Sequence, residues 1–287
     1  MTAALEITKQ RDRGAGQNWL TAIADVLPRI IFAIYMVLFF AYLFLPLAVM
    51  AAATFNTSKF PTVTPWLGTT LEWFRALWAD QAMWQSLRLS LVICAGVIAI
   101  SLPVGMAAAL FLNSLHSRAR GFFYALMVSP LLTPGVAIGI ATLVLWRQAG
   151  VGGGTFLIIL AQSSFIAAYV MLMVVARLQR FDRTLEEAAI GLGASRFKVF
   201  RRILLPYLRP SLLAAAFIAF LQSFENYNTT LFVRGTQTPL TVYIATKVRT
   251  GLTPAVNALG LILIVLTIVA AVAFELTRQA RTRKAQT

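Results

Sequence analysis

Glu225 places a carboxylate within an apolar stretch of the sequence, where it could bind a solute. A carboxylate at membrane depth is costly unless it is paired, protonated or facing a water-filled cavity, so it is a functional candidate. Four polar residues at helical spacing share a face around it: Gln222, Glu225, Asn226 and Thr229. We predict that this face lines a path for a polar solute and that Tyr227 points elsewhere. The alternatives are a buried hydrogen bond to a neighbouring helix, or a position at the outer interface, where the cost vanishes.

A single carboxylate with aromatic side chains nearby would suit an amine cation through charge pairing and cation–π contact. The sequence lacks the residues that several other kinds of site need. One cysteine, Cys94, and one histidine, His116, exclude an intrachain disulfide, a multi-cysteine zinc site and any site that needs two histidines. The sequence also lacks the Gly-x-x-x-x-Gly-Lys-Ser/Thr motif of a P-loop. We therefore expect no enzyme and no cofactor on this chain, with any ATP and Mg²⁺ bound by a partner subunit.

The elements that must position these residues are membrane-spanning helices. The chain of 287 residues is 59% hydrophobic and 12% charged and has a mean hydropathy of +0.77, which excludes an ordinary soluble domain. A helix needs roughly 20 apolar residues to cross the hydrocarbon core, and about six stretches qualify. These stretches are 30–53, 87–112, 122–145, 155–176, 212–233 and 255–276. The sequence thus predicts an all-α membrane protein with about six transmembrane helices.

The basic residues act as topology signals. The formal charge is +15 and the pI is near 11.0, yet most of the Lys and Arg residues fall on the side that holds both chain ends. By the positive-inside rule, both termini are predicted to be cytoplasmic. We therefore expect membrane lipid, and no nucleic acid, around this chain. The predicted organisation is a cytoplasmic segment over 1–29, a transmembrane domain over 30–276 and a basic cytoplasmic tail over 277–287.

The loop between the fourth and fifth stretches, 182–209, is predicted to form two short helices. The residues expected to begin and end them are Thr184 with Glu187 as a capping box, Gly191 and Gly193, Ser195, and Pro206. In the second helix an apolar stripe is formed by Phe197, Phe200, Ile203 and Leu204, with Arg and Lys on the other faces. The result is a basic, amphipathic, cytoplasmic hairpin. A helix resting on anionic lipid is the alternative that periodicity leaves open.

The spacing of residues within this hairpin is similar to the E-A-A-x3-G-x9-I-x-L-P signature of ABC importer membrane subunits. The matching residues are Glu187, Ala188, Ala189, Gly193, Ile203, Leu205 and Pro206. The chain therefore resembles a binding-protein-dependent ABC transport permease, from the first apolar stretch to the basic tail. The resemblance implies a type I ABC importer permease fold in which the hairpin is a coupling helix seated in a groove of an ATPase. In that role Ala188 and Ala189 would allow close seating, Glu187 would pair with a basic group, and Gly193 would set the turn.

Three further segments are similar to the spermidine/putrescine permease branch, specifically its second permease. They are Phe-Asn-Thr-Ser at 55–58, Ser129-Pro130 with Pro134, and Thr-Pro-Ala-Val-Asn-Ala at 253–258. The resemblance implies a polyamine solute, a heterodimer with a second permease subunit, two ATP-binding subunits, a periplasmic or extracellular solute-binding protein and a place in the bacterial inner membrane.

The sequence departs from this branch at one position. Permeases of the branch often carry two adjacent aspartates where this chain has Glu225 and Asn226, so one charge is missing. An opine, an amino-acid derivative, a phosphonate or ferric iron is the alternative solute within the same importer class. A secondary transporter is a more distant alternative, which would need coupling-ion groups in several spans.

Overall fold

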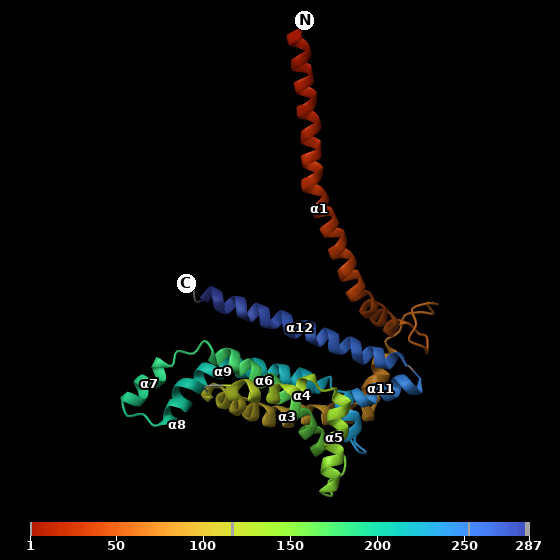
Figure 1. The fold of residues 1–287 in the computed structure, drawn as a ribbon. Helices are drawn as coiled ribbons and strands as arrows, with labels where there is room; N and C mark the ends of the chain where they lie inside the picture. The colour runs from red at the N-terminus through yellow and green to blue at the C-terminus, as the bar shows by residue number, and fades with distance from the viewer. Residues whose placement is uncertain (1, 116–117, 252, 285–287) are drawn as a thin grey trace. The chain divides into compact units, whose positions relative to one another are not determined.

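The computed structural model describes residues 2–115, 118–251 and 253–284 and confirms the predicted all-α fold (Figure 1). His116 and residues 285–287 of the predicted tail lie outside the described residues. The elements are α1 (Thr2–Phe55), α2 (Glu72–Ala79), α3 (Gln81–Ser114), α4 (Arg118–Leu132), α5 (Gly135–Gln148), α6 (Thr155–Leu178), α7 (Thr184–Gly191), α8 (Arg196–Val199), the π-helical turn η1 (Phe200–Leu204), α9 (Leu205–Phe224), α10 (Asn228–Val233), α11 (Leu240–Thr250) and α12 (Pro254–Lys284).

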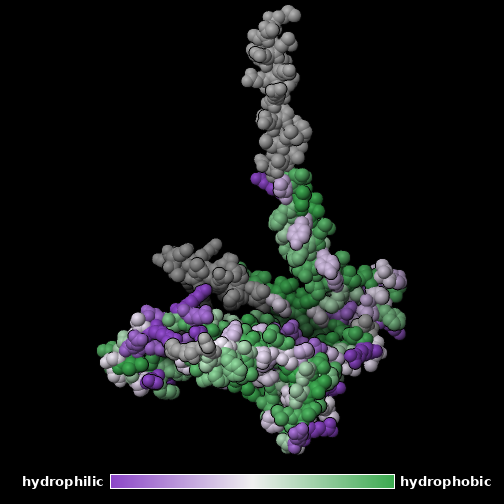
Figure 2. All heavy atoms as spheres, viewed as in Figure 1, coloured by the Kyte–Doolittle hydropathy of each residue, from purple (hydrophilic) through white to green (hydrophobic). Residues whose placement is uncertain are grey.

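One compact unit is formed by residues 1–77 and 252–287. In it α1 packs against α12, and a Cβ added at Gly260 would come within 3.2 Å of the Met50 side chain. The described side chains of α1 form an exposed apolar band from Val26 to Val49 (Figure 2). The helix is continuous from Thr2, so the predicted segment 1–29 and the first predicted span belong to one helix. An apolar band of this length suits a lipid environment.

The second compact unit, residues 78–251, is built around α6, which packs against α3 and α9. Buried side chains, most of them from these three helices, form two apolar clusters, one that includes Val170 and one that includes Leu157. Small residues permit the close approach, because a Cβ added at Gly105 of α3 would lie 2.6 Å from the Ala167 carbonyl oxygen. Packing through small residues is how helices associate in lipid. The three helices thus form the frame on which the polar residues are placed.

The third predicted span, 122–145, is broken in two. α4 ends at Leu132 and α5 begins at Gly135, with a bend of 101° between them (Figure 1). Pro134 precedes α5 and has no N–H to continue the helical hydrogen bonds, and it disfavours a helical conformation at Thr133. Among the described residues, four helices are long and apolar enough to cross a membrane, or five if the bent pair is one span. The apolar part of α12, Pro254–Val269, is shorter.

Candidate functional site

The fifth predicted span, 212–233, is also two helices, and its polar residues lie at the break. α9 ends at Phe224 and α10 begins at Asn228. The Asn226 side chain stabilises the start of α10, since its Oδ1 accepts hydrogen bonds from the N–H and the hydroxyl of Thr230, at 3.2 and 3.1 Å. An asparagine side chain that binds nearby backbone in this way competes with helix continuation. The prediction of one continuous helix is therefore wrong, and Glu225 lies at a turn.

A cavity of about 280 Å³ lies at this break. Its lining includes the four residues predicted to face a solute path, Gln222, Glu225, Asn226 and Thr229. Tyr227 lines it too, so the prediction that this ring points elsewhere is wrong. The lining residues that were not predicted are Leu131, Thr133, Gly135, Ile138, Phe165, Tyr169 and Asn228. Phe165 and Tyr169 are four residues apart, a spacing that indicates a shared helix face but does not distinguish a cavity from packing.

Glu225 gives this cavity its charge. The lining contains no Lys or Arg, and within the described residues the exposed Glu225 carboxylate makes no ion pair or hydrogen bond. Three aromatic residues line the same cavity, Phe165, Tyr169 and Tyr227. An unpaired carboxylate beside aromatic rings is an arrangement that attracts a cation.

Thr229 adds a polar group without a partner. The residue is fully buried, and its Oγ1 has no hydrogen-bond partner in the part of the chain that the structure describes. A Cβ added at Gly135 would lie 2.8 Å from this Oγ1, and one added at Gly139 would lie 2.7 Å from the Thr229 carbonyl oxygen. The two glycines thus allow α5 to approach α10 closely. The close approach of α5 buries this hydroxyl, and a buried hydroxyl without a partner is costly.

The hairpin between α6 and α9 begins with α7, whose cap differs from the predicted one. Asp182, rather than Thr184, accepts the capping hydrogen bonds: its Oδ1 receives the Thr184 N–H at 3.0 Å and the Thr184 hydroxyl at 2.8 Å. These two hydrogen bonds hold the pKa of Asp182 below its ordinary value. The capping box of Thr184 and Glu187 is therefore wrong.

The end of α7 is set by Gly193. Its φ is +83°, and its N–H donates to the Ile190 carbonyl at 2.9 Å while the Ala194 N–H donates to the Ala189 carbonyl at 3.0 Å. These two bonds make a Schellman motif, in which the residue after the helix takes the left-handed conformation. Gly191, by contrast, is the last helical residue.

The second helix of the hairpin begins as predicted and ends elsewhere. Ser195 caps α8, with its Oγ accepting the Lys198 N–H at 3.3 Å. Pro206 does not stop the helix, because η1 joins α8 to α9 and the chain is helical from Arg196 to Phe224. A π-helical turn contains one extra residue, and here it lets the helix continue past Pro206, which has no N–H to donate. The predicted stop at Pro206 is therefore wrong.

The hairpin exposes apolar side chains. Leu185, Ile190, Leu192 and Phe197 are 52%, 48%, 89% and 71% exposed, beside exposed Arg and Lys side chains (Figure 2). Of the signature residues, Glu187 and Ala188 are exposed, Ala189, Ile203 and Leu205 are half-buried, and Gly193 and Pro206 are exposed. Ile203, Leu205 and Pro206 lie at the base of the hairpin, on η1 and α9, and Leu204 packs into the core. Exposed apolar groups surrounded by charge are typical of a protein-binding surface.

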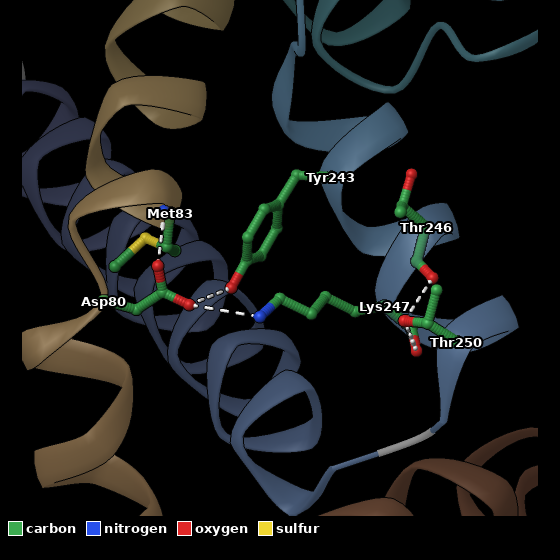
Figure 3. A network of polar contacts seen from close by, with 6 residues as sticks. All are labelled: Asp80, Met83, Tyr243, Thr246, Lys247 and Thr250. Carbon is green, nitrogen blue, oxygen red and sulfur yellow. Dashed lines mark hydrogen bonds and ion pairs between the residues drawn. The ribbon is translucent and has the colours of Figure 1, made fainter.

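A cluster that the sequence did not predict joins α3 to α11 (Figure 3). Asp80 caps α3 by accepting the Met83 N–H at 3.1 Å, and it also accepts the Tyr243 hydroxyl at 2.6 Å. Lys247 lies 3.5 Å from the same carboxylate and 5.3 Å from the centre of the Tyr243 ring. Burial acts to raise the pKa of Asp80, but the hydrogen bonds and Lys247 outweigh it and lower the pKa below its ordinary value. Burial and the Asp80 charge raise the pKa of Tyr243.

Comparison with known sequences finds relatives that match most of the chain. Residues 101–283 match the family described as binding-protein-dependent transport system inner membrane component. The spermidine/putrescine transport system permease protein PotC of Escherichia coli is 29% identical over 252 residues, which is 87% of this chain and 94% of PotC. The putrescine transport system permease protein PotI of Escherichia coli is 33% identical over 240 residues, 80% of this chain and 84% of PotI.

Comparison with solved structures shows the fold. A chain of a bacterial alginate ABC transporter, in complex with a periplasmic protein bound to an alginate pentasaccharide, has a TM-score of 0.67 at 16% identity, over 88% of this chain and 93% of that one. A chain of the MetNI methionine ABC transporter in an inward-facing conformation has a TM-score of 0.53 at 21% identity, over 72% and 97%. The helices described above therefore have the arrangement of an ABC transporter permease.

Proposed function

The chain belongs to the family of binding-protein-dependent transport system inner membrane components, and from this membership we propose that its solute is a polyamine such as spermidine or putrescine. As a family member it is a multi-pass permease subunit of an ABC importer and not an enzyme. The proposed assembly adds a second permease subunit, two ATP-binding subunits that hold ATP and Mg²⁺, and an external solute-binding protein. Both termini would then lie in the cytoplasm, where the hairpin meets the ATP-binding subunits.

The observation that carries the solute assignment is the charge of the cavity. Within the described part of the chain Glu225 is unpaired, and the cavity is lined by three aromatic residues and by no Lys or Arg. A primary ammonium group would pair with the carboxylate, and its methylene chain would lie along the rings. The relatives named for spermidine and putrescine transport support the same solute class.

The same charge argues against the alternative solutes. A phosphonate, an opine or an amino-acid derivative carries an anionic group, which this lining does not match with a cation. Ferric iron favours several hard oxygen ligands, and the described residues contain no group of three or more His, Cys, Asp or Glu that could hold a metal ion. Asn226 does not replace the missing second acid, because its Oδ1 is already bound to Thr230.

The exposed surface of the hairpin supports its assignment as the ATPase-coupling element. Glu187 and Ala188 lie exposed on α7, beside the apolar side chains of Leu185 and Ile190. An ATPase groove would cover this apolar surface, and a basic group in it would pair with Glu187. Because the chain is helical without interruption from α8 through η1 into α9, movement of the hairpin would move α9 with it.

The test is stimulation of ATP hydrolysis in the complete reconstituted importer with its solute-binding protein. The solutes to compare are putrescine, spermidine, an opine, an aminophosphonate and ferric iron. We expect stimulation by putrescine or spermidine alone. Stimulation by one of the other solutes, without any response to a polyamine, would overturn the solute assignment.

A further inference from the structure

The buried amide of Gln162 connects the two sides of the helix break. Gln162 lies in α6 and is 1% exposed. The Ser223 hydroxyl, in the last turn of α9, donates to Gln162 Oε1 at 2.6 Å. Gln162 Nε2 donates to the Thr230 hydroxyl, in the first turn of α10, at 2.8 Å. The Thr230 hydroxyl in turn lies 3.1 Å from Asn226 Oδ1, to which it donates.

This chain of hydrogen bonds needs an amide. A carboxamide has one acceptor and one donor end in a fixed plane, so it can receive the Ser223 proton and give a proton to Thr230 at the same time. An aliphatic side chain of similar size would fill the space and leave both hydroxyls, each in a residue at most 5% exposed, without these partners. In an apolar bundle such hydroxyls would seek other acceptors, and the most available are the carbonyls of their own helices.

We propose that Gln162 is a positioning residue that holds the α9–α10 break open, so that Glu225 faces the cavity. The link bypasses the turn itself: Gln162 binds Ser223 before the turn and Thr230 after it, while Glu225 and Tyr227 between them stay free to line the cavity. Asn226 takes part in both the cavity and the hydrogen-bond chain, because it lines the cavity and accepts the hydrogen bond from Thr230. The effect on transport rests on the proposed function, but the effect on the break does not.

The geometry of the break can be measured without transport. In the assembled importer, the buried Cys94 is replaced by alanine, which adds no hydroxyl beside Ser223, and Glu225→Cys supplies a thiol at the break. The reaction rate of this thiol with a cationic, membrane-impermeant methanethiosulfonate reports how far position 225 opens to the cavity. Adding Gln162→Leu should slow the reaction on the order of tenfold, the change expected from losing hydrogen bonds of this kind.

Two further variants keep the proposal falsifiable if Gln162→Leu fails to assemble. Thr230→Val removes the hydrogen bonds of the Thr230 hydroxyl with Gln162 and with Asn226, and Ser223→Ala removes the one from Ser223 to Gln162. Both variants leave α6 unchanged. Ser163→Ala is the matched control, because Ser163 is also buried in α6 and its Oγ has no partner within the described residues. Slower labelling in the Gln162 and Thr230 variants, with Ser163→Ala as fast as the parent, supports the proposal. Equal rates in all variants overturn it.

Uptake separates this proposal from the proposed function. With Glu225 in place, Gln162→Leu should raise the KM for putrescine uptake about tenfold while the basal ATP hydrolysis of the complex stays unchanged. Slower labelling together with an unchanged KM would support the positioning role of Gln162 and overturn the assignment of this cavity to the solute path. Unchanged labelling with a raised KM would overturn the positioning role.

Discussion

The guanidinium of Arg177 lies over the ring of Tyr207, with its Cζ 4.2 Å from the ring centre. The two residues also exchange hydrogen bonds: the Tyr207 hydroxyl donates to the Arg177 carbonyl at 3.2 Å, and Arg177 Nε donates to the Tyr207 carbonyl at 3.4 Å. Arg177 is in the last turn of α6 and Tyr207 in the first turn of α9, so the pair closes the base of the hairpin. One turn further along, the Ser211 hydroxyl donates to the Met173 carbonyl at 3.0 Å.

This contact predicts a loss of coupling when the ring is removed. Tyr207→Leu should lower the number of solute molecules imported per ATP, because movement of the hairpin would then be transmitted to α9 but not to α6. Tyr207→Phe keeps the ring and loses one hydrogen bond worth about 1 kcal/mol, so it should keep most of the coupling. The ratio of uptake to ATP hydrolysis in proteoliposomes measures this, with Tyr124→Leu as a control at an exposed tyrosine of α4. A wild-type ratio in Tyr207→Leu would rule out the role.

A charge reversal on α7 tests the coupling surface. Glu187→Lys should abolish uptake, because an exposed carboxylate proposed to meet a basic group would become a like charge. Membrane insertion should be normal, since this side chain is exposed. Glu72→Lys, an exposed acid at the start of α2, is the control for charge reversal itself. Normal uptake by Glu187→Lys would show that α7 does not dock through this residue.

The carboxylate at the break can be tested by an isosteric change. Glu225→Gln removes the charge of the cavity, so the KM for putrescine should rise about tenfold or more, the usual effect of removing one partner of a partly desolvated charge pair. Glu225→Asp keeps the charge and should retain more of the affinity. Uptake kinetics over a range of putrescine concentrations provide the measurement. If Glu225→Gln behaves as the wild type, the side chain is structural.

The Asp80 cluster predicts a pH dependence of stability. Because the pKa of Asp80 in the folded chain is below its ordinary value of 3.8, the carboxylate stabilises the fold above that value and ceases to do so as the pH falls through the folded pKa. The contribution should be at most about 1 kcal/mol, since the site is partly exposed. Asp80→Asn keeps a good helix cap and loses the charge. Its thermal unfolding temperature in detergent should be lower than the wild-type value near neutral pH, and the gap should close as the pH falls through the folded pKa of Asp80. A constant gap would refute the assignment.

Two neighbouring glycines provide a matched pair for backbone strain. Gly193→Ala should destabilise the hairpin by about 1–2 kcal/mol, because its φ of +83° is disfavoured for a residue with a Cβ. Gly191→Ala should be neutral or slightly stabilising, since Gly191 is helical and a Cβ there would meet no atom of the described residues within 4 Å. Hydrogen exchange of the α7 backbone amides distinguishes the two. Equal protection in both variants would contradict the role of the Schellman turn.

The sequence predicted the helices better than their interruptions. Apolar runs locate α3 and α6 because burial and lipid exposure both demand apolar side chains, and the cap at Ser195 depends only on neighbours in sequence. The break at Asn226 was missed because hydropathy does not respond to a change of direction. The contact of Asp80 with Tyr243 joins residues far apart in the chain, so it follows from the fold alone. Tyr227 was misplaced because a continuous helix was assumed.

The π-helical turn at Phe200–Leu204 also fixes the rotation of α8 about the axis of α9. Each residue of an α-helix turns the chain by about 100° around the axis, so one residue more or fewer between α8 and α9 would swing α8 and the chain before it around the axis of α9 by that angle. Deleting Arg201 would shorten the connection by only about 1.5 Å and yet aim Phe197 in a different direction. The length of this short segment therefore fixes the direction in which the hairpin points relative to α9, and the segment should tolerate substitution far better than insertion or deletion.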